Sequence, residues 1–245
     1  MNYLKSFLVS LQFLTQIPVK FKHYPDDKTV ASSLIFYPLI GLLIGIMLAA
    51  VAMALSAAPA FLTGAVVLTL WVVITGALHL DGLADSCDAW IGGQGDKLRT
   101  LAIMKDPCSG PIAVVMLVCT LLLKLSAIVA IIQLQLHWML LIAPLVSRSL
   151  LPILLLMTPY VREGGIGAIL VKYAPKQWVF CSCILGIVGS LMLAPFNIVL
   201  AAVVGVFALR NMMLNRLDGL TGDTAGATIE LVEVVVIVAI VLNIY

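Results

Sequence analysis

The sequence predicts an all-α fold, a polytopic integral membrane helical bundle with about seven transmembrane helices plus an N-terminal interfacial helix. Hydrophobic residues make up 62% of the 245 residues, charged residues make up only 11%, and the mean hydropathy is +1.16. A soluble domain averages about 45–50% apolar and about 25% charged residues. Several apolar stretches also approach the roughly 20 residues that a helix needs to cross a bilayer. We therefore expect a single membrane-embedded domain over residues 1–245, surrounded by the lipid bilayer.

Composition also excludes two other classes of protein. A net charge of +2 provides no basic surface for a nucleic acid, so no nucleic-acid partner is expected. Five cysteines are an odd, sparse set without metal-ligand spacing, which argues against a secreted disulfide scaffold.

Residues 1–20 predict a helix lying on the membrane surface. Apolar residues recur at helical spacing and Pro18 ends the pattern, whereas Gln12 and Gln16 interrupt the apolar run and argue against a signal peptide. A frayed terminus is the alternative. The apolar positions are Leu4, Phe7, Leu8, Leu11 and Leu14.

Seven apolar stretches follow, and short turns join six of them into three helical hairpins. The sixth stretch is short, so residues 178–210 could instead form one long tilted helix. The stretches cover 34–55, 60–78, 112–132, 136–157, 178–194, 197–210 and 229–244.

The placement of basic residues favours seven spans over six. With seven, residues 1–33, 79–111, 158–177 and 211–228 share one membrane face, which carries twelve lysines and arginines when Arg210 at the end of the sixth stretch is included, while the opposite face carries none. Merging the fifth and sixth stretches would move Arg210 and Arg216 to the opposite face. The positive-inside rule then predicts that the basic face is cytoplasmic.

A first acidic cluster lies in HLDGLADSCD, residues 79–88. Asp81, Asp85 and Asp88 have the spacing of one helical face, where three like charges repel unless a cation lies between them. Carboxylate oxygens suit a hard ion such as Mg²⁺ or Mn²⁺. His79 lies off this face, which favours an indirect role. The alternative is that these carboxylates are exposed to solvent at the N-terminus of a helix and only stabilise the helix dipole.

A second acidic cluster spans residues 218–233. Asp223 and Glu230 are seven residues apart, and Glu230 and Glu233 enter the seventh span, where an ionisable group is costly and usually functional. Four spans separate the clusters, so both open on the cytoplasmic face. We therefore expect them to meet in a two-part metal site.

Basic residues lie between the two clusters. Arg99, Lys105 and Arg162 could neutralise a diphosphate substrate, or could serve only to orient the chain in the membrane. Arg148 lies in mid-span and needs a partner such as Glu230, Glu233 or a substrate. We expect Lys124 to reach the membrane surface by snorkelling.

With these motifs assembled, the chain resembles the cobalamin synthase family, the adenosylcobinamide-GDP ribazoletransferases, over nearly its whole length. FLTQIPV at 13–19 is similar to the family's FLTRIPV, and HLDGLADSCDA at 79–89 is similar to its HLDGLADxxDG. Gln16, Ala89, Cys108 and Asp218 depart from the usual residues, which puts local loop contacts in doubt. The remaining motifs are IMKD at 103–106, VSR at 146–148, REGG at 162–165 and TGDTxxAxxE at 221–230.

The resemblance implies an enzyme of cobalamin biosynthesis in the cytoplasmic (inner) membrane of a prokaryote, with its active site facing the cytoplasm. The family transfers the phosphocobinamide group of adenosylcobinamide-GDP to α-ribazole or its 5′-phosphate, releases GMP and uses Mg²⁺. Asp81, Asp85, Asp88 and Asp223 would hold the metal, and Asp88 or Glu230 would accept the proton of the attacking hydroxyl. The candidate substrate-binding residues are His79, Arg99, Lys105, Asp106, Arg148, Arg162 and Glu233.

Two alternatives are a CDP-alcohol phosphotransferase and a secondary transporter. In the first family an arginine follows the alanine of the aspartate motif, where this chain has Asp85. A transporter would place its acidic residues near the bilayer midplane, whereas most acidic residues of this chain cluster at one membrane face. The sequence leaves open whether the chain forms a homo-oligomer.

Overall fold

The computed structural model describes residues 2–162 and 164–244, and helices dominate this part of the chain. A single isolated β-bridge joins Tyr160 and Leu220 there. The helices are α1 (Tyr3–Leu14), α2 (Asp27–Ala31), η1 (Ser32–Phe36), α3 (Tyr37–Ala54), α4 (Ala60–Thr75), α5 (Leu78–Gly93), α6 (Lys97–Ile103), α7 (Pro111–Gln133), η2 (His137–Leu141), α8 (Ile142–Met157), α9 (Ile166–Tyr173), α10 (Lys176–Leu193), α11 (Phe196–Leu217) and α12 (Gly222–Ile244).

The predicted polytopic helical fold is confirmed. Six helical segments are long and apolar enough to cross a membrane, namely 27–54, 111–133, 137–157, 176–193, 196–217 and 222–244. Helices α4 and α5 pass the same test only as a pair, bent by 86°. Gly76 and Ala77 make this bend with φ angles of 62° and 55°, a left-handed conformation that suits glycine and is uncommon for alanine. We take α4 as a further span, the second in chain order, which brings the number among the described residues to seven, and α5 as a helix that turns out of it.

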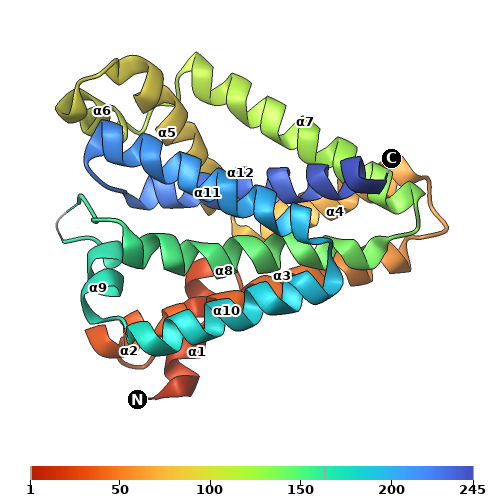
Figure 1. Cartoon of the computed structure of the whole chain (residues 1–245), viewed down its shortest axis with the longest axis horizontal. Coiled ribbons are helices and arrows are strands. Elements are labelled where there is room, and N and C mark those ends of the chain that lie inside the picture. The colour runs from red at the N-terminus through yellow and green to blue at the C-terminus, as the bar shows by residue number, and fades with distance from the viewer. Residues whose placement is uncertain (1, 163, 245) are drawn as a thin grey trace.

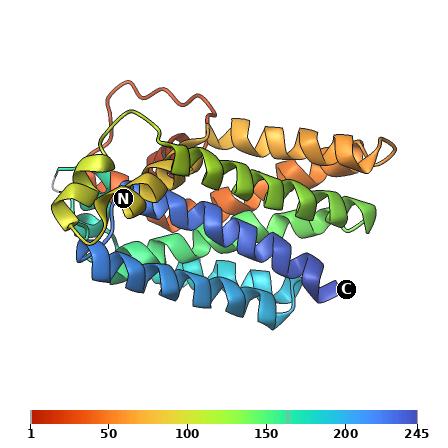
Figure 2. The same ribbon diagram turned by 90° about the horizontal axis from the view of Figure 1, so that it is seen from above.

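The long helices lie side by side, and the short helices gather at one end of the bundle (Figures 1 and 2). The hairpin connections at 55–59, 134–136 and 194–195 lie at the opposite end, together with the C-terminus (Figure 2). These connections contain no charged residue, whereas α1, α2, α5, α6 and α9 mark what we call the basic end. The predicted one-sided distribution of charge is therefore confirmed.

Two predicted boundaries are wrong. Helix α11 has 22 residues and continues to Leu217, so the sixth span is a full-length helix separated from α10 by Ala194 and Pro195. Its Arg210 still reaches the basic end, where it donates to the carbonyl of Met157. Helix α12 begins at Gly222 instead of residue 229, because the Thr221 hydroxyl accepts the Thr224 N–H and starts the helix there.

The N-terminal segment forms the expected helix as α1, which ends before Pro18. Phe7 packs edge-to-face on Phe36 with ring centroids 5.8 Å apart, and the Ser6 hydroxyl donates to the Thr29 carbonyl. Beyond α1, the Gln16 N–H donates to the Ile74 carbonyl at 2.7 Å. The segment therefore docks on the bundle beside the bend between α4 and α5.

Candidate active site

The two acidic motifs meet where α5 crosses the start of α12. Helix α5 carries Asp81, Asp85 and Asp88 as expected, and the first turn of α12 carries Asp223. Gly82 allows the crossing, since a Cβ atom there would lie 2.7 Å from the Asp223 carbonyl oxygen. The two clusters therefore meet through Asp223, whereas Glu230 and Glu233 of the second cluster pair with Lys124 inside the bundle.

Gly82→Ala is expected to reduce activity at least about tenfold, because the added methyl group forces α5 and α12 apart and overpacking of this kind costs about 1–3 kcal/mol. Turnover and thermal stability of the purified protein check this. Gly205→Ala in α11 is the matched control, since a Cβ there meets nothing within 4 Å. Equal activity in the two variants would show that the close crossing is not needed.

The carboxylates at the crossing are crowded. Asp81 is exposed and Asp85 is half-buried, and neither forms an ion pair within the described residues. Burial, followed by the negative charges of Asp81 and Asp223, raises the pKa of Asp85 to about 6. A cation between the carboxylates would relieve this repulsion, and carboxylate oxygens are ligands that hard divalent ions prefer.

Asp223 has a basic partner from another part of the chain. Its carboxylate lies 2.7 Å from the guanidinium of Arg162, which follows α8 and also donates to the Met104 carbonyl at 3.4 Å. The predicted REGG motif continues with Glu163, which lies outside the described residues. Arg162 therefore lies at the acidic crossing, where a negatively charged substrate would compete for it.

Asp88 is directed to the N-terminus of α7. Its carboxylate accepts the N–H groups of Gly110 and, at 2.9 Å, Ala113, which have no carbonyl partner within the helix. Within the described ranges, no three His, Cys, Asp or Glu side chains are close enough to hold a metal ion. The expected four-carboxylate site is thus not assembled in this arrangement, because α7 engages Asp88 and Arg162 engages Asp223.

A cavity of about 260 Å³ opens beside the crossing, facing α8 and α9. Asp81, Asp223 and the buried His79 line it, with Phe13 from the N-terminal motif and Tyr160 from the loop after α8. Sequence spacing gave no reason to select Tyr160. The position of Phe13 at the cavity could be expected only from the family motif at 13–19, because neither charge nor helical periodicity distinguishes this residue.

A buried ionic network lies within the bundle and links α7, α8 and α12. The Lys124 ammonium is 2.6 Å from Glu230 and 2.5 Å from Glu233, and Arg148 pairs with Glu233. The expected partner for Arg148 is confirmed. The snorkelling expected of Lys124 is wrong, because two carboxylates and the Trp71 ring, whose centroid is 4.5 Å away, hold its ammonium inside.

The remaining sequence candidates lie around the site. Arg99, Lys105 and Asp106 are exposed on α6 and the loop after it. The Asp106 carboxylate accepts the Cys108 N–H at 3.0 Å. Glu230 is only 2% exposed, pairs with Lys124 and does not line this cavity. The Nδ1 atom of His79 has no hydrogen-bond partner among the residues that the structure describes.

Comparison with known proteins gives a match over nearly the whole chain. The cobalamin-5-phosphate synthase family matches residues 6–241. A protein of Pseudomonas fluorescens named adenosylcobinamide-GDP ribazoletransferase is 47% identical over 96% of this chain and 98% of its own length. Proteins of the same name from Pseudomonas putida (48% identical over 97% of this chain and 98% of their own) and Pseudomonas aeruginosa (47% over 98% of each) are similar as well. No solved structure matches the chain.

Proposed function

The chain belongs to the cobalamin-5-phosphate synthase family, and from this membership we propose that it is an adenosylcobinamide-GDP ribazoletransferase. Its substrates are adenosylcobinamide-GDP and α-ribazole or α-ribazole 5′-phosphate, and its products are the corresponding cobalamin and GMP. The observation that carries this proposal is the meeting of two acidic motifs with Arg162 at the basic end. The match over residues 6–241 argues against a CDP-alcohol phosphotransferase or a transporter.

The reaction is a displacement at phosphorus. A ribose hydroxyl of α-ribazole forms a new P–O bond to the phosphate that carries cobinamide, the bond to the bridging oxygen breaks, and GMP leaves with the electron pair. The protein's contribution to such a transfer is mainly positioning and neutralisation of charge. Arg162 would neutralise phosphate charge at the crossing, and the exposed Arg99 and Lys105 are further candidates to bind the GMP portion.

Mg²⁺ would be held by Asp81, Asp85 and Asp223, with Asp88 as a further ligand, and would supply charge neutralisation for the diphosphate. Mg²⁺ is usually bound by one or two carboxylates together with substrate phosphates, so a complete protein cage is not required. Asp88 is the better candidate for the proton acceptor, because it is partly exposed, whereas Glu230 is buried with Lys124.

We place the protein in the inner membrane of a prokaryote with the basic end in the cytoplasm. The asymmetry of lysine and arginine supports this orientation. Both phosphorylated substrates would then reach the acidic crossing from the cytoplasm, while the apolar outer surfaces of helices such as α10 face lipid.

The test is an assay of purified protein with Mg²⁺, adenosylcobinamide-GDP and α-ribazole 5′-phosphate. We expect release of GMP together with a cobalamin product in equal amounts, and loss of both when EDTA removes the metal. Restoration of activity by added Mg²⁺ distinguishes metal removal from denaturation. Folded protein that forms no product would refute the proposed activity, and full activity in EDTA would refute the metal requirement.

A further inference from the structure

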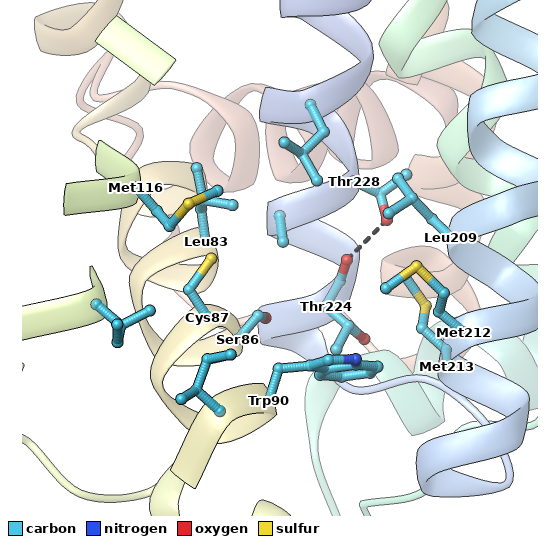
Figure 3. A pocket seen from close by; sticks show the side chains of 14 residues that line it. Leu83, Ser86, Cys87, Trp90, Met116, Leu209, Met212, Met213, Thr224 and Thr228 are labelled. Atoms are coloured by element: carbon cyan, nitrogen blue, oxygen red, sulfur yellow. Dashed lines mark hydrogen bonds between the residues drawn. The ribbon is translucent and has the colours of Figure 1, made fainter. Parts of the chain in front are cut away.

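A second cavity, of about 270 Å³, lies on the other side of the same crossing and faces α7 and α11. Figure 3 shows that Met116, Met212 and Met213 surround it together with the indole of Trp90. We call this cavity the methionine pocket. Its volume is near the low end for small-molecule sites, about 300 Å³, so it fits one part of a substrate and not a whole nucleotide-linked corrinoid.

One polar group in the methionine pocket lacks a partner. Ser86 is only 7% exposed, and its hydroxyl has no hydrogen-bond partner among the described residues. The neighbouring Thr228 hydroxyl is satisfied, since it donates to the Thr224 carbonyl at 2.8 Å (Figure 3). A buried hydroxyl left unpaired is costly, so Ser86 indicates a ligand that is mostly apolar but carries one hydrogen-bonding atom.

We propose that the methionine pocket binds the heteroaromatic base of the ribazole acceptor, an inference that rests on the proposed function. Thioether sulfurs make favourable contacts with aromatic rings, and the Trp90 indole offers a further aromatic surface. A ring nitrogen of the base would accept a hydrogen bond from the Ser86 hydroxyl. A lipid acyl chain would also fit the apolar wall, but it would leave Ser86 unpaired.

The position of the pocket relative to the carboxylates supports this assignment. Ser86 directly follows Asp85 on α5, and Thr224 directly follows Asp223 on α12. A base held between these two helices therefore places its attached ribose beside the acidic crossing. The cavity lined by Asp81 and Tyr160, on the other side, stays free for the second substrate.

Kinetics of pocket variants test the assignment. Ser86→Ala is expected to raise the KM for α-ribazole 5′-phosphate about tenfold, the effect of one lost hydrogen bond, and Met116→Trp should raise it further by filling the pocket. The KM for adenosylcobinamide-GDP should change less than about twofold, because that substrate binds elsewhere. Met192→Trp on α10 is the matched control, since Met192 is 84% exposed and far from the pocket.

Chemical labelling provides a readout that needs no turnover. Cys87 lines the pocket and Cys181 on α10 is exposed, so alkylation of both can be followed in one sample by mass spectrometry. We expect α-ribazole 5′-phosphate to slow alkylation of Cys87 at least about fivefold and to leave Cys181 unchanged, whereas a short-chain phospholipid has no such effect.

Protection of Cys87 by the phospholipid alone would overturn the assignment, as would an unchanged KM for α-ribazole 5′-phosphate in both pocket variants of an active enzyme. A wild-type protein without turnover contradicts the proposed function instead. In that case the labelling result still supports or overturns binding of the base in the pocket.

Discussion

Asp223→Asn is expected to abolish turnover while the protein still expresses and folds. The change removes a negative charge from the crossing of α5 and α12 and leaves Arg162 without its carboxylate partner. Because a catalytic metal supplies several kcal/mol of charge stabilisation, we expect kcat to fall by roughly 10²–10³-fold or more. Asp85→Asn should have a similar effect. Initial rates of GMP release measure both.

Asp218→Asn is the matched control for these variants. Asp218 lies in the same segment, but its side chain is 78% exposed and pairs only with Lys97 among the described residues. Its activity should stay within about twofold of the wild type, since exposed ion pairs contribute little. Near-normal activity of Asp223→Asn would contradict the metal-ligand role, and equal losses in all three variants would indicate a general effect of charge.

Arg148→Met is expected to destabilise the folded protein strongly. Arg148 and its partner Glu233 are both fully buried, so removing the arginine leaves Glu233 with only the shared Lys124. Breaking a buried pair by removing one partner costs about 3–5 kcal/mol. For a chain of this length we expect the Tm in detergent to fall by roughly 10 °C.

The double variant Arg148→Met with Glu233→Met is the test of this explanation. It leaves Lys124 and Glu230 as a balanced pair 2.6 Å apart, so we expect it to regain more than half of the lost Tm. Arg99→Met, at an exposed position on α6, should leave the Tm unchanged. A double variant as unstable as the sum of its two single changes would show that the charges are not coupled.

The sequence predicted the helical spans well because the bilayer imposes a length and a composition on them. Turn residues suggested a break between α10 and α11 at Pro195, and the one-sided lysines and arginines decided in favour of that break and identified the basic end. The start of α12 was missed because residues 222–228 are small and only weakly apolar, so hydropathy did not reveal that they are helical.

The side-chain arrangement at the site was less predictable. Helical spacing placed Asp81, Asp85 and Asp88 on one face, but it could not show that α7 presents its free N–H groups to Asp88. Contacts of this kind depend on how helices pack across the bundle, which local spacing does not encode. Lys124 was misjudged for the same reason, since its two carboxylate partners belong to another helix.

The most direct test of the account is the binding of Mn²⁺, as a paramagnetic substitute for Mg²⁺, to the purified protein. Electron paramagnetic resonance should show bound Mn²⁺ in the presence of adenosylcobinamide-GDP, because substrate phosphates complete the coordination of such ions. We expect this binding to be retained in Asp218→Asn and lost in Asp223→Asn. Equal binding of Mn²⁺ by the wild type and Asp223→Asn would contradict a metal-dependent transfer at the crossing of α5 and α12.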